Sequence, residues 1–409
     1  MKDISEHKLN QRIGVLGGGQ LGRMLLPPAL RLNLELGFLD PDANAPCRAN
    51  AAYFQHGDLM DFETVCDFGR RFDLITTEIE HVNTDALAGL ADEGVRVRPS
   101  AKILALVQDK LKQKEFYQTH GIPTAEFAGV ENREDLLRRL PELRRLFPVM
   151  QKLRRSGYDG RGVQKLPDAP ADSDDAEHAG IAALAATAFD APSLIERRIP
   201  FEKEIAVIVS RNPSGDVALY PPVEMEFHPT ANLVELLFAP ADLTPAVVSR
   251  SESIARQIAE ELQLEGILAV EMFVTTDGEV LVNEIAPRPH NSGHHTIEAC
   301  VTSQFEQHLR AILDFAPGAT TLIAPAAMVN LLGTRGQGPA QYPGIEKILA
   351  MPGVHLHLYG KRLTRPFRKM GHVTITGPAG DLHSPAAVQA VRETARRIRE
   401  SVEIVGETH

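Results

Sequence analysis

The sequence predicts an α/β protein whose N-terminal part carries a parallel sheet. Over the first hundred residues, short apolar runs alternate with stretches of helical periodicity, which is the pattern of strands joined by crossover helices. The chain has 409 residues, more than one ordinary hydrophobic core organises, so we expect about two to three domains.

The N-terminal elements follow in order from this alternation. Strands are expected at 12–16, 34–39 and 73–76, where apolar residues cluster, with helices at 21–30 and 62–72 between them. Because each helix connects two strands, the strands are expected to run parallel to one another.

The central part of the chain begins with one helix, expected over residues 107–119 because His120-Gly121-Ile122-Pro123 stops it. Strand-like runs at 147–153 and 162–166 then flank a basic, glycine-rich turn. The other expected elements are strands at 205–209 and 217–220, an amphipathic helix through Ile254, Ile258 and Leu262, and a smaller unit after about residue 316.

Composition excludes several classes of protein. The formal net charge of −11 argues against a protein that coats nucleic acid, since phosphate neutralisation needs concentrated basic surface. Cys47, Cys66 and Cys300 have no metal-binding spacing and are expected to be reduced thiols. The charged N-terminus lacks the apolar stretch of a signal peptide, and no apolar run is long enough to span a membrane. We therefore expect a cytoplasmic protein.

The first glycine motif, Gly17-Gly18-Gly19-Gln20-Leu21-Gly22, lies between an expected strand and an expected helix. Such a turn brings backbone N–H groups and a helix N-terminus to an anion, and Asp40 could hold the ribose of NAD. An NAD-dependent oxidoreductase is one hypothesis from this motif. The alternative is a close strand–helix turn without a ligand.

The second glycine motif combines glycines with basic residues over 151–162. Glycines let a loop fold over phosphates while Lys and Arg offset the phosphate charge, as a phosphoryl-transfer site requires. It is not a Walker sequence. The alternative interpretation is an exposed basic turn.

A hairpin is expected where Asp277-Gly278 separates two apolar runs. A two-residue loop would pair Thr276 with Glu279 and would set Glu271 opposite Glu284. Two shielded carboxylates need a cation, and oxygen ligands beside a phosphate-binding loop favour magnesium. A register slip, or a structural ion pair of one glutamate with Lys or Arg, remains open.

The segment 283–296, which begins at the end of this hairpin, contains two prolines and is expected to be a rigid loop. Arg288 and Asn291 could hold an oxyanion beside the metal. Arg288 could instead neutralise the two glutamates. Three histidines in the loop suggest zinc, but no carboxylate or cysteine spacing supports that metal.

Together these motifs resemble the ATP-grasp superfamily and, within it, the 5-(carboxyamino)imidazole ribonucleotide synthase family, over nearly the whole chain. The motifs that support the resemblance are 17–24, 77–80, 108–110, 157–162, 270–273, 283–296, 303–306 and 359–361. Other ATP-grasp carboxylases, such as a biotin carboxylase, and formate-dependent ribonucleotide ligases share the ATP-binding half. A non-catalytic nucleotide-binding module is a further alternative, as is the oxidoreductase.

The resemblance implies a cytoplasmic, homodimeric ligase of de novo purine (IMP) biosynthesis that uses ATP, Mg²⁺ and bicarbonate to carboxylate 5-aminoimidazole ribonucleotide through carboxyphosphate. It implies a Rossmann-like domain at 1–105, an ATP-grasp region at 106–315 with a lid at about 120–200, and a C-terminal domain at 316–409. Neither nucleic acid nor a membrane is expected as a partner.

The resemblance also assigns site residues. Glu271 and Glu284 match the metal ligands, Asp159 the acceptor of the amine proton, and Arg288 and Asn291 the groups that orient bicarbonate. ATP is matched by Lys110, Lys152, Gly157, Tyr158, Asp159, Gly160, Arg161, Gly162, Val163, Glu196, Arg197, Arg198, Ile199, Glu204, His228, Asn283 and Glu284. The ribonucleotide is matched by Gln20, Glu80, Tyr158, Arg161, His290, Lys361 and Arg368.

Three local features qualify these assignments. Ser156 stands where many members carry glycine, and His295 occupies a position that is often aromatic. The basic stretch 359–369 is either a solvated loop or an anion-binding loop, and in a chain of net charge −11 a local basic cluster favours an anion partner.

Overall fold

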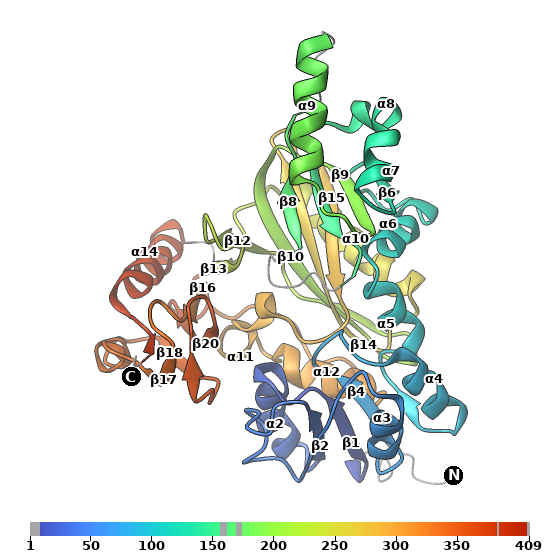
Figure 1. Cartoon of the computed structure of the whole chain (residues 1–409). Helices are drawn as coiled ribbons and strands as arrows, with labels where there is room; N and C mark the ends of the chain where they lie inside the picture. Colours follow the sequence, from blue (N-terminus) through green and yellow to red (C-terminus); the bar gives the residue numbers. More distant parts are fainter. Residues whose placement is uncertain (1–8, 156–161, 169–173, 383, 407–409) are drawn as a thin grey trace. The chain divides into compact units, whose positions relative to one another are not determined.

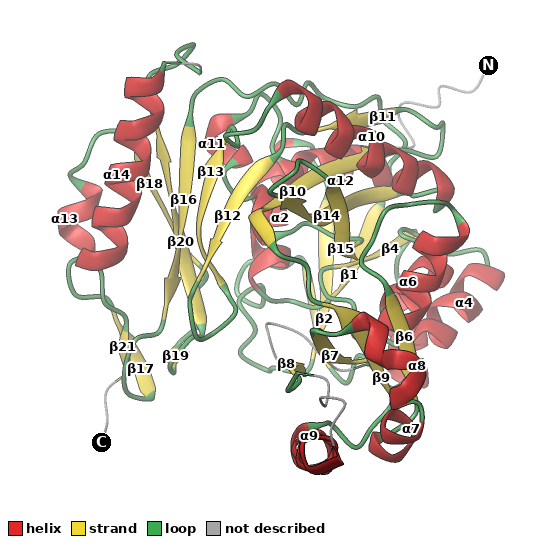
Figure 2. Cartoon of the chain, turned by 90° about the horizontal axis from the view of Figure 1, so that it is seen from above, coloured by secondary structure: helices red, strands yellow, loops and turns green. Residues whose placement is uncertain are grey.

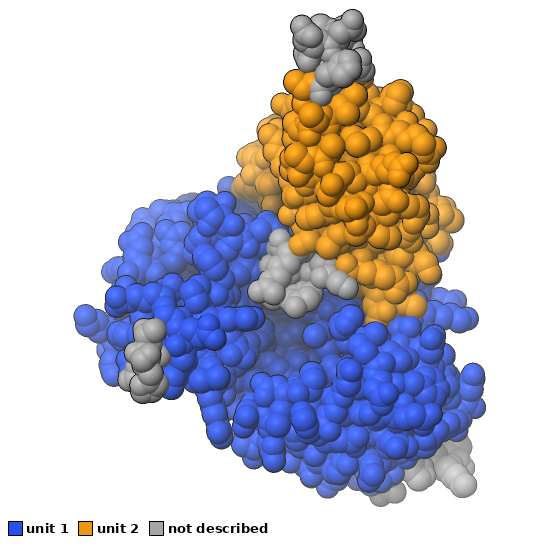
Figure 3. Space-filling view, in the orientation of Figure 1, with its two compact units in different colours: residues 1–104, 205–270, 285–409 blue, residues 105–204, 271–284 orange. Residues whose placement is uncertain are grey.

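The computed structural model describes residues 9–155, 162–168, 174–382 and 384–406. The chain forms two compact units (Figure 3). Unit 1 consists of Met1–Leu104, Ile205–Val270 and Ile285–His409, and unit 2 of Ala105–Glu204 and Glu271–Glu284. The division into three domains stays a prediction.

Unit 1 begins with a parallel sheet in the order β3-β2-β1-β4-β5. Strands β2, β1 and β4 of this sheet are labelled in Figure 1. Its strands are β1 (Arg12–Leu16), β2 (Glu35–Asp40), β3 (Tyr53–His56), β4 (Leu74–Thr77) and β5 (Arg96–Val97). The three predicted strands and the parallel fold class are confirmed. The sequence missed β3, which is half exposed and mostly polar, and β5, which has two residues.

Helices α2 (Gln20–Arg31), α3 (Phe62–Gly69) and α4 (Thr84–Asp92) connect these strands. The Asp61 side chain caps α3 and the Asn83 side chain caps α4, whereas Gly19 at the start of α2 provides no side-chain cap. The N-terminus of α2 must therefore find other acceptors for its N–H groups. Helix α12 (Gln304–Ile312) packs against α2 in one apolar cluster with β1 and β2.

A second part of unit 1 is an antiparallel sheet that contains β12 (Val223–Phe227), β13 (Val234–Ala239), β16 (Ala326–Leu332), β20 (Lys369–Thr376) and β18 (Val354–Leu358) in that order. Helix α14 (Pro385–Ser401) covers one face of this sheet (Figure 2). Alternate residues of β16 and β20, such as Val329 and Val373, point toward its apolar face at Val391 and Ile398.

The sheet order continues from β12 through β10 (Phe201–Arg211) to β14 (Gly266–Thr275) and β15 (Val280–Ala286). Along the chain, each of these three strands runs from one unit into the other. The predicted strand at 205–209 and the two arms of the predicted hairpin are confirmed.

Unit 2 contains an antiparallel sheet in the order β6-β9-β7-β8. Its strands are β6 (Phe127–Val130), β9 (Ser193–Arg197), β7 (Val149–Leu153) and β8 (Val163–Lys165). Helices α7 (Arg133–Arg138), α8 (Leu140–Leu143) and α9 (Asp174–Thr187) belong to the same unit.

The helix predicted over 107–119 is wrong at its start. The structure has α5 (Ala101–Val107) and then α6 (Lys110–Thr119), separated by Asp109. The Asp109 carboxylate accepts hydrogen bonds from the N–H groups of Leu111 and Lys112, so it caps a new helix rather than continuing the old one.

The remaining elements of the described residues are short segments and one long helix. They are η1 (Arg144–Leu146), β11 (Val217–Leu219), α10 (Pro245–Glu261), η2 (Asn291–Gly293), α11 (Thr296–Ala299), β17 (Gly338–Gln341), α13 (Ile345–Leu349), β19 (Leu363–Thr364) and β21 (Val405–Gly406). In the part of the chain that is described, no helix combines the length and apolarity needed to cross a membrane.

Candidate active site

Two lysines that the family resemblance matched to ATP line one cavity of unit 2. Lys110 Nζ forms an ion pair with Glu284 Oε2 at 2.6 Å, and Lys152 Nζ donates to Asn283 Oδ1 at 2.9 Å. The structure thus brings together four predicted site residues from α6, β7 and β15. The side chains that line this cavity are Lys110, Gln113, Lys114, Lys152, Leu194, Asn283 and Glu284.

A third lysine and a glutamate form the buried side of this cluster. Lys114 contacts Glu196 Oε1, and Lys152 Nζ forms an ion pair with Glu196 Oε2 at 2.6 Å. The Lys114 and Glu196 side chains are only 3% and 4% exposed. Burial would raise the pKa of the Glu196 carboxyl, but attraction to the two ammonium groups outweighs it and lowers that pKa to about 2.

The sequence assigned Glu196 to the nucleotide and did not single out Lys114. Burial lowers the pKa of Lys114 to about 8, although Glu196 attracts its charge. Glu196 holds two lysine side chains in place, which is a role that the motif alone did not show. The signal for Lys114 was its spacing of four residues from Lys110, which places both side chains on one face of α6.

The turn between β14 and β15 differs from the predicted two-residue loop at Asp277-Gly278. The Thr275 N–H donates to the Glu279 carbonyl at 3.0 Å, and the Gly278 N–H donates to the Thr275 carbonyl at 3.0 Å. The loop therefore comprises residues 276–278. Gly278 has φ of +85°, which is the conformation that such a three-residue loop requires of its last residue.

This loop changes the register expected for the two glutamates. The predicted pairing of Thr276 with Glu279 is wrong. The pairing of Glu271 with Glu284 was counted outward from it and therefore no longer follows. The two carboxylates still act on one ammonium group. Burial lowers the pKa of Lys110, but attraction to carboxylates that include Glu284 and Glu271 outweighs it and raises that pKa.

The donor set near Lys110 fits a magnesium ion that also binds a nucleotide. Glu271 and Glu284 supply carboxylate oxygens, and Mg²⁺ commonly uses one or two carboxylates together with substrate phosphates. Within the described ranges, no three or more His, Cys, Asp and Glu side chains converge as metal ligands. A divalent cation at the two glutamates would need phosphate or water for its other positions.

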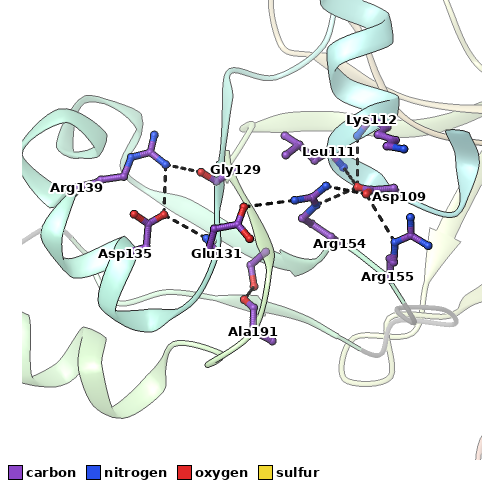
Figure 4. Close-up of polar contacts among 11 residues, drawn as sticks. Asp109, Leu111, Lys112, Gly129, Glu131, Asp135, Arg139, Arg154, Arg155 and Ala191 are labelled. Carbon is purple, nitrogen blue, oxygen red and sulfur yellow. Dashed lines mark hydrogen bonds and ion pairs between the residues drawn. The ribbon is translucent and has the colours of Figure 1, made fainter.

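Asp109 fixes the start of the basic glycine loop as well as the start of α6 (Figure 4). Its carboxylate accepts from Arg154 Nε at 3.1 Å and from Arg154 Nη2 at 2.8 Å. The Lys110 N–H donates to the Arg154 carbonyl at 2.9 Å. The two segments that bear Lys110 and Lys152 are therefore joined by side-chain and backbone bonds.

The loop itself lies largely outside the described residues. This applies to Ser156 and to the predicted site residues Gly157, Tyr158, Asp159, Gly160 and Arg161. Gly162 is described, with φ of +70°, and Val163 begins β8.

The other residues assigned to the nucleotide have diverse positions. Burial raises the pKa of the Glu204 carboxyl to about 7. The Arg197 guanidinium donates to the Arg145 carbonyl at 2.9 Å, and residues 198–200 link β9 to β10. In unit 1, His228 Nδ1 accepts two backbone N–H groups of its own turn, and its ring contacts Phe367 edge-on.

In unit 1, protein carboxylates occupy the first glycine turn. Glu78 accepts from the N–H groups of Gly19 at 2.6 Å and Gly22 at 2.7 Å. Asp40 accepts from Gly18 at 2.6 Å and from Asp42 at 2.7 Å. These N–H groups and Asp40 are the groups that a dinucleotide would use, so the oxidoreductase hypothesis loses both of its supports.

Residues assigned to the ribonucleotide meet beside this turn. Lys361 Nζ donates to Gln20 Oε1 at 2.6 Å and to the Lys369 carbonyl at 2.8 Å. Arg368 is half-buried, and its guanidinium donates to the Leu363 carbonyl at 2.9 Å. The structure brings Lys361 and Gln20 into direct contact.

The segment that follows β15 holds the groups assigned to bicarbonate. The loop predicted over 283–296 is wrong at both ends, because residues 283–286 belong to β15 and Thr296 begins α11. Arg288 Nε forms an ion pair with Glu80 Oε1 at 2.7 Å. The side-chain amides of Asn291 and Asn330 exchange two hydrogen bonds, at 2.9 and 2.8 Å. His290 Nδ1 lies 2.9 Å from Ser292 Oγ. Asn330 comes from β16, and nothing in the sequence linked it to this loop.

These features define a protein of the ATP-grasp class, and the ATP-grasp domain family matches residues 115–305. The ribonucleotide synthetase preATP-grasp domain matches residues 10–108, and the phosphoribosylaminoimidazole carboxylase C-terminal domain matches residues 326–382. The chain belongs to the N5-carboxyaminoimidazole ribonucleotide synthase family.

Individual proteins support this family. The N5-carboxyaminoimidazole ribonucleotide synthase of Synechococcus elongatus is 38% identical over 366 residues, covering 89% of each chain. The phosphoribosylaminoimidazole carboxylase of Schizosaccharomyces pombe is 42% identical over 377 residues, which are 89% of this chain and 65% of that protein. The chain thus spans less than two thirds of the length of this relative.

Solved structures agree over nearly the whole chain. The N5-carboxyaminoimidazole ribonucleotide synthetase of Thermotoga maritima superposes with a TM-score of 0.82 at 38% identity, covering 97% of this chain and 100% of that one. The Aspergillus clavatus N5-carboxyaminoimidazole synthase in complex with ADP and 5-aminoimidazole ribonucleotide has a TM-score of 0.80 at 34% identity, covering 95% and 100%.

Proposed function

We propose that this protein is a ligase of purine biosynthesis that uses ATP and bicarbonate to carboxylate the exocyclic amine of 5-aminoimidazole ribonucleotide. The observation that carries the proposal is the cluster of Lys110, Lys152, Asn283 and Glu284 around one cavity of unit 2. Family membership and the Aspergillus clavatus complex with ADP and 5-aminoimidazole ribonucleotide support the same reaction.

The nucleotide phosphates are the ligands that this cluster suits. Acidic and amide partners hold the ammonium groups of Lys110 and Lys152 at one cavity, and two cations so positioned would offset phosphate charge. Glu204 and the linker Arg197–Ile199 are assigned to the nucleoside. Magnesium, when bound by Glu271 and Glu284, would stabilise the charge on the transferred phosphoryl group.

The bicarbonate is assigned to Arg288 and Asn291. A bicarbonate oxygen attacks the terminal phosphorus of ATP, so that carboxyphosphate forms and ADP leaves. Arg288 is already oriented by Glu80, which fixes the guanidinium as a donor for the oxyanion. Asn291 is held by Asn330, so its direct part in binding would require this amide pair to open.

The ribonucleotide amine then attacks the carbonyl carbon of carboxyphosphate and phosphate leaves, or carboxyphosphate first breaks down to phosphate and carbon dioxide and the amine attacks the carbon dioxide. Asp159 is assigned to accept the amine proton, with Tyr158 beside the imidazole. Lys361 and Arg368 are assigned to the 5′-phosphate, and Gln20, Glu80 and His290 to the remaining contacts. The pairing of Lys361 with Gln20 supports one common site for these two residues.

The assembly and the compartment belong to the same proposal. We infer a homodimer in the cytoplasm from the family resemblance, and the three free, buried cysteines suit a reducing compartment. An oligomeric mass from light scattering tests the dimer.

One assay tests the reaction. Phosphate release from ATP is measured with bicarbonate, with and without 5-aminoimidazole ribonucleotide, and ¹³C-bicarbonate reports the carbamate product by NMR. We expect ribonucleotide-dependent phosphate release with one labelled product per phosphate. Label appearing only on biotin, or turnover that requires formate, would instead support another ATP-grasp carboxylase or ligase.

A further inference from the structure

Glu78 is a buried carboxylate that no assigned catalytic role uses. It follows β4, is 8% exposed as a residue, and its two oxygens each accept one backbone N–H, from Gly19 and Gly22. Gly19 and Gly22 lie at the N-terminus of α2, where the N-cap residue Gly19 has no side chain with which to cap the helix. Glu78 therefore supplies the acceptors that the helix itself lacks.

The glycines of the turn make room for this carboxylate. A Cβ atom on Gly19 would lie 2.6 Å from Glu78 Oε1, and one on Gly17 would lie 2.6 Å from Glu78 Cγ. Gly17 also has φ of +95°, which side chains rarely allow. The glycines of this turn resemble a dinucleotide-binding fingerprint, but here they leave room for the carboxylate of Glu78.

The position of Gln20 depends on this arrangement. Gln20 lies directly after Gly19 and is the first residue of α2, so fixing the Gly19 and Gly22 N–H groups fixes its backbone. Its side chain accepts from Lys361, which comes from a distant part of the sequence in the same unit. Glu78 is thus linked to Lys361 through one turn of helix.

We propose that Glu78 is a positioning residue for the ribonucleotide: by holding the Gly19 and Gly22 N–H groups, it sets Gln20 against Lys361. The inference rests on the proposed function, because it takes Gln20 and Lys361 to bind the substrate. It goes further in assigning the control of their geometry to a residue that touches neither the substrate nor the nucleotide.

The charges around Glu78 add a pH dependence to this role. Burial raises the pKa of the Glu78 carboxyl to about 7, against the two backbone hydrogen bonds that lower it. Asp40, from the end of β2, raises this pKa further, and Arg288 lowers it. Cys47, whose own pKa is raised mainly by burial and further by Glu78, also lies near this carboxylate.

The sign follows from the hydrogen bonds. Above neutral pH the ionised carboxylate accepts both N–H groups. As the pH falls through about 7, the added proton occupies one oxygen and weakens one of these bonds. The KM for the ribonucleotide should therefore rise on acidification, beyond the rise caused by the substrate phosphate, whose second pKa of about 6 affects every variant equally.

Glu78→Gln tests the proposal, because an amide can accept one N–H but turns its own NH₂ toward the other. We expect a roughly tenfold higher KM for the ribonucleotide, loss of the inflection near pH 7, and a KM for ATP within about twofold of wild type. Asp73→Asn is the matched control, since Asp73 also accepts a backbone N–H beside β4, from Arg12. Asp73→Asn should leave the KM for the ribonucleotide and its inflection near pH 7 unchanged.

A third variant keeps the test decisive if Glu78→Gln fails to fold. Asp40→Asn removes the negative charge that raises the Glu78 pKa, so the inflection in KM should move to lower pH. An unchanged KM and pH profile in Glu78→Gln, or an unmoved inflection in Asp40→Asn, overturns the positioning role. Absence of ribonucleotide carboxylation by the wild-type protein would overturn the proposed function instead.

Discussion

Replacing Glu196 by glutamine should destabilise unit 2 strongly, because its carboxylate compensates two ammonium groups. Glu196 contacts Lys114 and Lys152, and the Lys114 side chain is 3% exposed. The Glu196 pKa is lowered from 4.5 to about 2, which corresponds to about 3 kcal/mol of stabilisation. Breaking one partner out of a buried ion pair costs ~3–5 kcal/mol, which agrees with this value.

The loss of stability in Glu196→Gln should depend on pH. Because the folded-state pKa of Glu196 lies below the unfolded value of 4.5, its contribution is complete above pH 4.5 and declines as the pH falls toward 2. The difference in stability between the wild type and Glu196→Gln should therefore shrink in acid. At neutral pH, Lys114 in the variant should lose its proton, since burial already lowers its pKa to about 8.

Hydrogen exchange of α6 and β9 peptides is the suitable assay, because a chain of two compact units need not unfold in one step. Glu142→Gln is the matched control, since Glu142 pairs with Arg139 on the exposed surface of the same unit. The double variant Lys114→Met with Glu196→Gln should be more stable than Glu196→Gln alone. A loss below about 1 kcal/mol, or no recovery in the double variant, would refute the reasoning.

Three further predictions concern ligands. Glu284→Gln should abolish ATP turnover while leaving the fold intact, with Glu279→Gln on the same hairpin as control; normal turnover across magnesium concentrations would rule out the metal assignment. NAD and NADP should not bind at the first glycine turn, because Glu78 and Asp40 occupy its N–H groups, and a calorimetric titration showing micromolar binding would contradict this. Asp159→Asn should keep ATP affinity and lose most carboxylation, whereas a parallel loss of both would indicate that Asp159 only shapes the loop.

The N-terminal sheet was predictable because its signal is local. Buried parallel strands require continuous apolar runs, and β1, β2 and β4 show such runs between amphipathic helices. The half-exposed β3 has no such run. It is a strand because it pairs with β2, and its own composition does not indicate that pairing. The start of α6 was missed for a similar reason: an aspartate in a polar sequence does not indicate whether it continues or caps a helix.

The candidate site was only partly visible in the sequence. Lys110, Lys152 and Glu284 could be singled out as charged residues within motifs, and the structure brings them to one cavity. Lys114 had only its spacing of four residues from Lys110 as a signal, and Asn330 had none, because its partner Asn291 lies 39 residues away along the chain. The hairpin shows the limit: Asp277-Gly278 indicated a turn, but one extra loop residue changed the register counted from it.

The sequence by itself determined the fold class and, through its motifs, the family, because periodicity, glycine spacing and charged motifs are properties of neighbouring residues. The tertiary structure decided what those motifs contact. The turn at Gly17–Gly22 has the glycines of an anion site, yet Glu78, 59 residues beyond Gly19, occupies it. The physical reason is that a buried N–H must find an acceptor, and only the folded chain shows whether that acceptor is a ligand or one of its own carboxylates.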